Sequence, residues 1–141
     1  MPDLKHIVLI SAAPEKVYAA VATQAGMRSW WTADTQMEEK VGGKAEFGFD
    51  KRSAVFRMTV ETLDPSHRVV LRCHGDQPEW NGTTLTFDVI KNEDGTNLIF
   101  VHSGWRELTE FCSNCNAMWG NLMYRLKDSS EGLGRGPQWN A

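Results

Sequence analysis

Clusters of basic residues are missing from this sequence of 141 residues. Its 18 Asp and Glu residues outnumber its 15 Lys and Arg residues, and the formal net charge is −3. The longest basic run is the pair Lys51–Arg52. Because proteins that bind nucleic acid through its phosphates carry a basic patch, the sequence gives no support for nucleic-acid binding.

Long hydrophobic runs and a full set of paired cysteines are also missing. The apolar run Ile7–Ile10 is too short for the core of a signal peptide or for a membrane span, so no membrane insertion is expected. The three cysteines, Cys73, Cys112 and Cys115, cannot all pair within one chain, which favours a reducing compartment. We therefore expect a cytoplasmic protein.

Complete catalytic and metal-binding motifs are absent as well. The sequence has no glycine-rich phosphate loop and no G-x-S-x-G nucleophile elbow. Cys112 and Cys115 form a C-x-x-C with dithiol redox spacing, but no second C-x-x-C or H-x-x-H is present to complete a zinc site. Cys115 also falls on an apolar helix stripe, which favours core packing. No catalytic residue, metal ligand or cofactor is predicted.

The sequence does contain a clear order of predicted elements at its start. A chain of this length is close to the usual domain size, so residues 1–141 are predicted to form a single domain. A strand is expected over His6–Ile10. Pro14, which suits the first turn of a helix, begins a short helix that ends near Thr23. A second short helical turn is expected over Met27–Trp31.

The hydrophobic period then changes from that of a helix to that of a strand. Alternating segments separated by turn residues predict an antiparallel meander of five or six strands. The segments run over 45–49, 55–61, 68–74, 83–90 and 97–103.

The last segment is helical again. Thr109 is a plausible N-cap, and the helix that follows is expected to span about 22 residues, or about 33 Å. Its apolar stripe consists of Phe111, Cys115, Met118, Trp119, Leu122, Met123 and Leu126. We predict an α+β fold in which a curved antiparallel sheet wraps around this C-terminal helix, with two short helices after the first strand and a cavity between helix and sheet.

Four segments carry a resemblance to a known family by their order and spacing. They are Ile10–Tyr18 followed by Trp30-Trp31, Val60-Glu61 through Asp64-Pro65 to Arg68–Val70, Thr96–Phe100 leading into His102–Trp105, and Trp119 with Leu122, Leu126 and Glu131-Gly132. Together they resemble the START-like (SRPBCC, Bet v 1-like) superfamily, and within it the branch named after the activator of Hsp90 ATPase homologue.

The resemblance implies a helix-grip fold with an internal ligand cavity. Members of the superfamily include carriers of lipids and other hydrophobic ligands, aromatase/cyclase enzymes and a co-chaperone domain, and the fold does not choose among them. The branch often carries an aromatic residue, commonly Trp, where this chain has Cys73. We therefore expect a wider or differently shaped cavity at that wall.

Six tryptophans in 141 residues are the strongest pointer to a ligand. Large flat rings suit planar or aliphatic ligands, and their indole N–H groups are fixed donors. We predict that the chain binds a small hydrophobic or aromatic ligand between the sheet and the C-terminal helix. The predicted lining residues are Trp31, Phe47, Met58, Trp80, Phe87, Phe100, His102, Trp105, Met118 and Trp119.

Three roles stay open for His102, which shares the strand parity of Leu98 and Phe100 and should point inward. It is a general base, a polar anchor for the ligand, or a core histidine with satisfied hydrogen bonds. A cyclase- or hydrolase-like enzyme acting on an aromatic or polyketide-like substrate would need it together with a second inward polar group. A co-chaperone module that binds an Hsp90-type chaperone would instead need an exposed apolar patch. Self-association into a homodimer also stays open.

Overall fold

The computed structural model describes residues 2–140 of the chain. In chain order, the elements are β1 (Leu4–Ile10), α1 (Pro14–Ala22), α2 (Gln24–Arg28), β2 (Thr35–Met37), β3 (Lys44–Phe49), β4 (Ala54–Asp64), β5 (Arg68–Cys73), the 3-10 helix η1 (Pro78–Trp80), β6 (Thr84–Asn92), β7 (Gly95–Ser103) and α3 (Glu110–Ser130). Among these described helices, none is long and apolar enough to cross a membrane.

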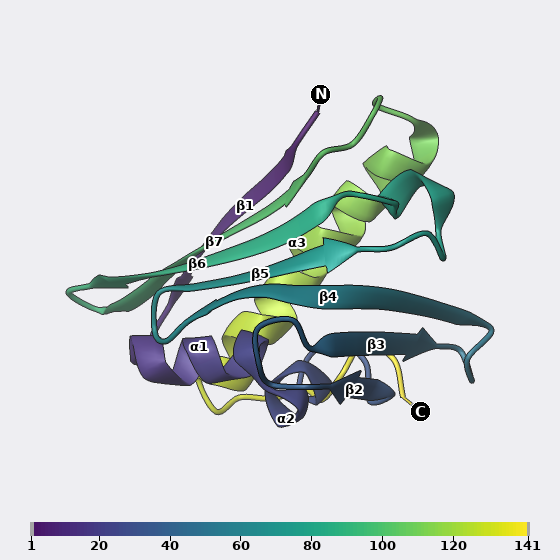
Figure 1. The fold of residues 1–141 in the computed structure, drawn as a ribbon. Helices are drawn as coiled ribbons and strands as arrows, with labels where there is room; N and C mark the ends of the chain where they lie inside the picture. The colour runs from purple at the N-terminus through teal and green to yellow at the C-terminus, as the bar shows by residue number, and fades with distance from the viewer. Residues whose placement is uncertain (1, 141) are drawn as a thin grey trace.

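The strands form one antiparallel sheet of seven (Figure 1). Its order is β1-β7-β6-β5-β4-β3-β2, so the strands from β2 to β7 form the predicted meander and β1 joins its far end beside β7. Along β1 and β7 the side chains alternate between a more buried and a more exposed face, which is the period-2 pattern of a half-buried strand. The predicted architecture is confirmed.

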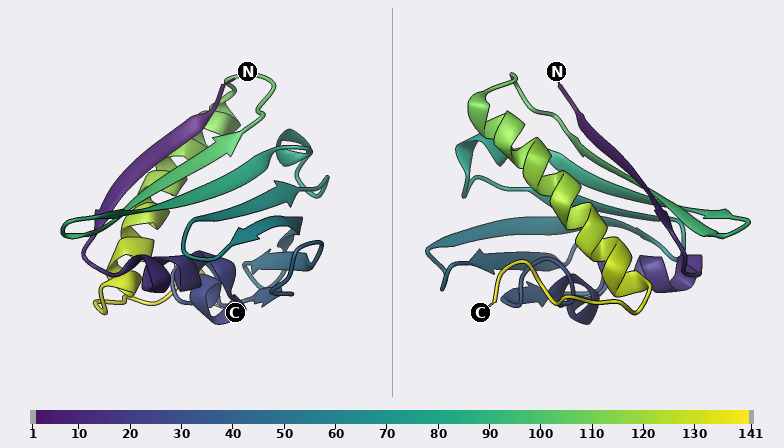
Figure 2. Two further views of the ribbon diagram at one scale, coloured as in Figure 1. Left: turned by 60° about the vertical axis from the view of Figure 1, so that its left-hand side comes forward. Right: turned by 180° about the vertical axis from the view of Figure 1, so that it is seen from behind.

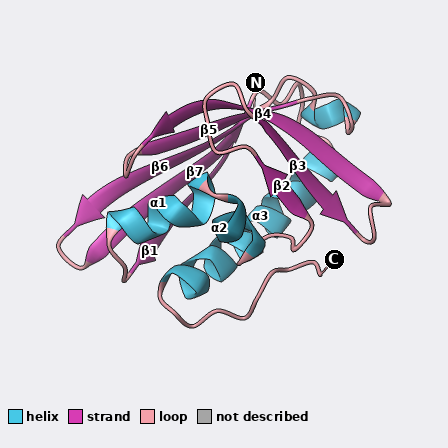
Figure 3. Ribbon diagram, turned by 60° about the horizontal axis from the view of Figure 1, so that its bottom comes forward, coloured by secondary structure: helices cyan, strands magenta, loops and turns pink. Residues whose placement is uncertain are grey.

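Helix α3 crosses the concave face of this sheet, as the right-hand view of Figure 2 shows. The helix begins where the Thr109 hydroxyl accepts the N–H of Cys112 at 3.0 Å, as the predicted N-cap. It ends before Gly132, whose φ of 81° is a left-handed conformation that glycine adopts easily. Figure 3 shows α1 and α2 on the same side of the sheet as α3, where they close one end.

The two short helices pack closely because of one glycine. A Cβ atom at Gly26 in α2 would lie only 2.0 Å from the carbonyl oxygen of Ala19 in α1, so only glycine permits this approach. The turn after α2 then places Trp30 and Trp31 inside the fold. The indole N–H of Trp30 donates to the carbonyl oxygen of Ala20 at 2.9 Å and fixes the turn to α1.

The C-terminal segment, residues 131–140, folds back beneath α3 to the turn that carries the two tryptophans (Figure 2). The N–H of Trp139 donates to the carbonyl oxygen of Trp31 at 3.1 Å, and the N–H of Ala33 donates to the carbonyl oxygen of Trp139 at 2.9 Å. From α3, the Arg125 guanidinium donates to the carbonyl oxygen of Gly136 at 2.8 Å. The segment thereby holds the Trp139 ring against Phe49, with ring centroids 4.9 Å apart.

Candidate functional site

The predicted lining residues come together between α3 and the sheet. All of them except Met118 are fully or almost fully buried in the core, and Met118 is half-buried and packs against it. We refer to their seven carbocyclic and indole rings as the aromatic cluster, which consists of Trp31, Phe47, Trp80, Phe87, Phe100, Trp105 and Trp119. Three of the seven rings come from strands β3, β6 and β7, and the other four come from η1, α3 and two connecting segments, so the cluster is a product of tertiary packing.

Trp119 lies at the centre of the aromatic cluster. It extends from α3 toward the sheet, where its ring centroid is 4.4 Å from that of Phe100 on β7. Its ring is also 5.2 Å from that of Trp31 and 5.9 Å from that of Trp80, which lies in η1 between β5 and β6. Phe87 on β6 is paired with Phe100 across the strands and its ring is 5.0 Å away. The rings are therefore in mutual contact, as buried aromatic pairs usually are.

His102 points inward from β7 as predicted, and both of its ring nitrogens have partners. The indole N–H of Trp119 donates to Nδ1 at 3.1 Å, so the neutral ring carries its own proton on Nε2. Nε2 then donates to the Thr83 hydroxyl at 2.8 Å, and this hydroxyl donates to the carbonyl oxygen of Trp80 at 2.6 Å. Burial lowers the pKa of His102 to about 3. The imidazole is thus neutral near pH 7 and holds two tryptophan-bearing elements together.

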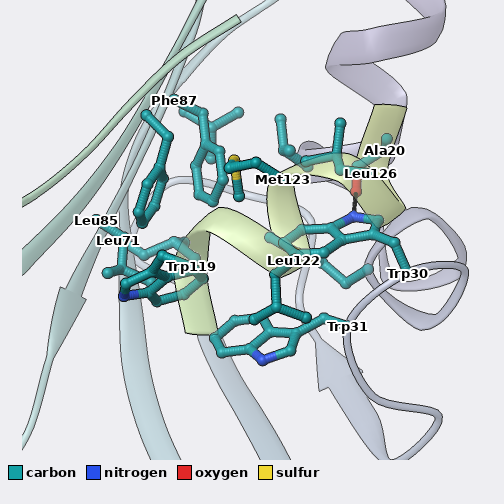
Figure 4. Packing of buried hydrophobic residues seen from close by; sticks show 14 of the residues in the cluster. Ala20, Trp30, Trp31, Leu71, Leu85, Phe87, Trp119, Leu122, Met123 and Leu126 are labelled. Carbon is teal, nitrogen blue, oxygen red and sulfur yellow. Dashed lines mark hydrogen bonds between the residues drawn. The ribbon is translucent and has the colours of Figure 1, made fainter. Parts of the chain in front are cut away.

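Among the described residues 2–140, three other indole N–H groups are buried without an acceptor. They belong to Trp31, Trp80 and Trp105. The side chain of Trp80 lies beside the Cys115 thiol, whose pKa is raised to about 11, chiefly by burial. In Figure 4 the indole nitrogen of Trp31 is turned away from Leu122, whereas that of the adjacent Trp30 points to the carbonyl oxygen of Ala20. Because buried donors are nearly always paired, these indoles mark the cluster as a candidate binding site.

Half-buried rings connect the aromatic cluster to the surface. Phe49 on β3 packs on Trp31 at 5.8 Å and on Phe56 of β4 at 5.4 Å. Phe56 in turn meets Trp80 edge-on at 4.6 Å. These contacts form a continuous path of aromatic surface from the exterior to the buried indoles, which we call the aromatic rim.

The cysteines take part in the packing of this region. Burial raises the pKa of the Cys73 thiol to about 12 and also raises that of Cys112. Cys112, Cys115 and Cys73 are all buried, which agrees with the packing interpretation of the C-x-x-C. Within residues 2–140, no group of three His, Cys, Asp or Glu side chains is arranged to hold a metal ion.

A hollow of about 780 Å³ lies along β2, β3 and β4. Its walls are largely polar side chains from the exposed positions of these strands, such as Lys44, Glu46 and Arg57. Arg57 is paired with Glu46 at 3.1 Å. Of the ten predicted residues only Met58 borders it, so this hollow is distinct from the aromatic cluster.

Sequence reasoning missed several residues that shape the site. Thr83 is the first residue of the predicted segment 83–90, and Trp139 lies outside every periodic segment. No local pattern shows that they contact His102 and Phe49. Phe49 and Phe56 do alternate with polar residues, and this signal could have placed both on the inner face. Trp30 was visible as half of a tryptophan pair, but its hydrogen bond to Ala20 depends on how α1 and α2 pack.

Comparison with known proteins gives one family and a set of similar structures. The family model described as "Activator of Hsp90 ATPase homolog 1-like protein" matches residues 11–131. The Aha1 dimer from Colwellia psychrerythraea is 33% identical in sequence, with a TM-score of 0.85 over 94% of this chain and 98% of that one. Protein MLL2253 from Mesorhizobium loti is 18% identical, with a TM-score of 0.80 over 91% and 96% of the two chains.

Protein BH1534 from Bacillus halodurans is also similar, at 23% identity and a TM-score of 0.76 over 93% of this chain and 98% of that one. At this level of identity, MLL2253 and BH1534 support the fold alone. No protein with a curated function matches the chain.

Proposed function

This chain belongs to the family of activator of Hsp90 ATPase homolog 1-like proteins, and from that premise we propose that it binds a small hydrophobic or aromatic ligand between α3 and the sheet. Its proposed lining is the set of ten residues predicted from the sequence: Trp31, Phe47, Met58, Trp80, Phe87, Phe100, His102, Trp105, Met118 and Trp119. The observation that carries the proposal is the set of buried indole N–H groups without acceptors inside an otherwise apolar cluster.

Ligand entry requires the rings at the aromatic rim to move, because the cluster is closely packed. Half-buried side chains are the ones free to do so, and Met118 adds a flexible, unbranched side chain at the same helix face. Covering about 200 Å² of apolar ligand surface contributes about 5 kcal/mol at about 25 cal/mol/Å², before the costs of association. We expect dissociation constants in the micromolar range.

Catalysis on a bound substrate is the first alternative. A cyclase- or hydrolase-like reaction would rely on His102 as a general base. Its two nitrogens are occupied by Trp119 and Thr83, and its pKa of about 3 leaves it a weak base. We propose that His102 orients the indoles of the site and takes no part in proton transfer.

Binding to a chaperone is the second alternative, suggested by the description of the family as activators of the Hsp90 ATPase. Such a module would use an exposed apolar surface. One is present on the outer face of the sheet, where Ile7 and Leu9 of β1 are 59% and 65% exposed and Ile90 of β6 is 47% exposed. Stimulation of the ATPase of an Hsp90-type chaperone by the purified chain, lost on Leu9→Lys, would favour this alternative.

The same outer-face patch, Ile7, Leu9 and Ile90, is our proposed surface for a homodimer. Leu9 and Ile90 lie on either side of Asn97 of β7 in one row across three strands, and Ile7 lies two residues from Leu9 on the same face of β1. The similar protein from Colwellia psychrerythraea is a dimer, and an apolar patch of this kind is typical of an association surface.

Calorimetric titration with neutral aromatics, sterols and fatty acids tests ligand binding. We expect saturable binding of at least one class at micromolar concentration. Met118→Trp should weaken it by narrowing the site, whereas Tyr124→Trp, on the 60% exposed side of the same helix, should leave it unchanged. Absence of binding by every class, or equal effects of the two variants, would contradict the proposal.

A further inference from the structure

The aromatic cluster has more buried hydrogen-bond donors than acceptors, and Trp31 is the unpaired donor that packs on the half-buried ring of Phe49 at the aromatic rim. The side chain of Trp31 is fully buried and its N–H has no acceptor. An indole N–H can donate but cannot accept. A ligand that satisfies it must therefore bring an acceptor atom to this position.

Acceptors from the protein are already committed elsewhere. Nδ1 of His102 receives the N–H of Trp119, and the Thr83 hydroxyl receives Nε2 of His102. The carbonyl oxygen of Trp31 itself receives the N–H of Trp139 from the C-terminal segment. Its ring neighbours, Phe47 at 4.4 Å and Phe49 at 5.8 Å, are hydrocarbons.

The charge around Trp31 also bears on the ligand. The four rings that pack on Trp31, those of Trp30, Phe47, Phe49 and Trp119, are all uncharged, and His102 is neutral near pH 7. The Arg125 guanidinium, on the side of α3 that faces the C-terminal segment, donates to Gly136 and has one buried N–H without an acceptor. A carboxylate placed at Trp31 would lose its hydration without a direct counter-charge, and burial of such a charge is expensive.

Resting on the proposed function, we infer that the ligand is a neutral, largely apolar and planar molecule with a carbonyl-type acceptor that the Trp31 indole N–H binds. The preference for a planar molecule comes from the flat rings around Trp31, since Phe47 is stacked on it at 4.4 Å and the tilted ring of Trp119 lies 5.2 Å away. These rings are in contact, so they must separate to admit the ligand. Trp30, stacked on Trp31 at 5.7 Å, keeps its N–H on Ala20 and supplies a packing surface only.

Three probes of one shape test this inference: 9-fluorenone, fluorene and fluorene-9-carboxylate. Their dissociation constants are measured by tryptophan fluorescence for the whole chain and for Trp31→Phe, which removes the donor and keeps an aromatic ring. The wild-type chain should bind fluorenone more tightly than fluorene, because only fluorenone has a carbonyl oxygen for the Trp31 N–H. In Trp31→Phe this hydrogen bond is lost, so the dissociation constant of fluorene divided by that of fluorenone should fall by about tenfold. Each probe has the same hydration free energy in water whether the wild-type chain or Trp31→Phe is titrated, so hydration does not contribute to the change in this ratio.

Three control variants keep the assignment specific. Trp30→Phe removes a donor that already has an acceptor, so the ratio should stay within about twofold of the wild-type value. Trp105→Phe and Trp80→Phe each remove another unpaired donor. If the preference for fluorenone over fluorene is lost in one of these variants and kept in Trp31→Phe, the assignment to Trp31 is overturned. In a ¹H–¹⁵N spectrum of the unmodified chain, fluorenone should move the indole signal of Trp31 and leave that of Trp30 in place.

The remaining outcomes separate the two proposals. Equal binding of fluorene and fluorenone, with the same ratio in every variant, overturns the acceptor inference while ligand binding stands. If fluorene-9-carboxylate binds more tightly than fluorenone, the inference that the ligand is neutral is overturned, and the Arg125 guanidinium becomes the group that binds the carboxylate. If none of the three probes binds and the wider ligand panel also fails, the proposed function falls with the inference.

Discussion

At the residue scale, the two adjacent tryptophans differ in one respect that determines their roles. Trp30 and Trp31 are both fully buried and stacked, but only Trp30 has an acceptor for its indole N–H. A buried donor without a partner destabilises a fold, whereas a paired one contributes to stability. This difference between neighbours of the same type is our reason for proposing that Trp31, and not Trp30, binds the ligand.

This difference predicts unequal effects of the same substitution. Trp30→Phe should lower the free energy of unfolding by about 1–2 kcal/mol more than Trp31→Phe, because only the first variant loses a hydrogen bond. Urea denaturation of the two variants and the wild type measures this. Equal losses would mean that Trp31 also has a partner in solution.

His102 predicts how stability depends on pH. Its pKa is about 3 in the folded chain and about 6.5 in the unfolded one, so between these values the unfolded state binds a proton that the folded state does not. Stability is therefore full above pH 6.5 and is lost as the pH falls toward 3. Between pH 7 and pH 5 the expected loss from this group is about 2 kcal/mol.

Denaturant titrations at the two pH values check this prediction. His102→Gln should be less stable than the wild type at pH 7, but its stability should not show the loss of about 2 kcal/mol between pH 7 and pH 5. His67→Gln is the control, because this side chain is 74% exposed, and this variant should show the same loss as the wild type. An identical decline in His102→Gln would show that other groups cause it.

Strand parity was enough to predict that His102 points inward, since it follows Leu98 and Phe100 in phase. Its partners could not be predicted in the same way. Thr83 reaches it only because η1 and β6 bring a turn across the sheet, and Trp119 reaches it because α3 crosses the concave face.

At the element scale, helix α2 determines where the tryptophan pair lies. Its contact with α1 depends on Gly26, where a Cβ would lie 2.0 Å from the carbonyl oxygen of Ala19. Gly26→Ala should therefore lower the free energy of unfolding by about 2–3 kcal/mol, because backbone atoms must move apart. Thermal unfolding provides the measurement.

Gly134→Ala is the matched control for this variant. The nearest atom to a Cβ at Gly134 is the Cα of Ser129 at 3.8 Å, an ordinary contact. It should change the free energy of unfolding by no more than about 0.5 kcal/mol. If both variants were equally stable, the close packing of α1 and α2 would not be what holds the tryptophan turn.

Element boundaries were partly predictable from the sequence. The cap at Thr109 and the stop near Gly132 gave α3 to within a residue or two, because both are local chemistry. Strand β1 begins at Leu4, two residues before the predicted start, and β2 is too short to show a period. The return of the C-terminal segment to Trp31 has no periodic signal at all, since it rests on a few backbone hydrogen bonds.

At the scale of the whole molecule, the meander and the long covering helix followed from the order of the predicted elements. The position of β1 beside β7 did not, because pairing between the two ends of a chain is set by tertiary structure. That pairing creates the outer-face patch of Ile7, Leu9 and Ile90, which no segment shows by itself.

This patch predicts the state of association. The wild-type chain should sediment as a dimer at micromolar concentration, and Leu9→Lys should shift it to a monomer by placing a charge in the apolar surface. Leu108→Lys, at a side chain that is 70% exposed away from the patch, should leave the dimer intact. A monomeric wild type in analytical ultracentrifugation would contradict the proposed interface.

The central claim is that an apolar ligand binds between α3 and the sheet, and isotope-filtered nuclear Overhauser measurements on a bound probe test it most directly. With 9-fluorenone in the site, the account predicts contacts to the methyl groups of Met118 and Leu122 on α3 and of Leu71 on β5. Contacts confined to Ile7, Leu9 and Ile90 on the outer face would show that the interior of the fold is a closed core and would contradict the account.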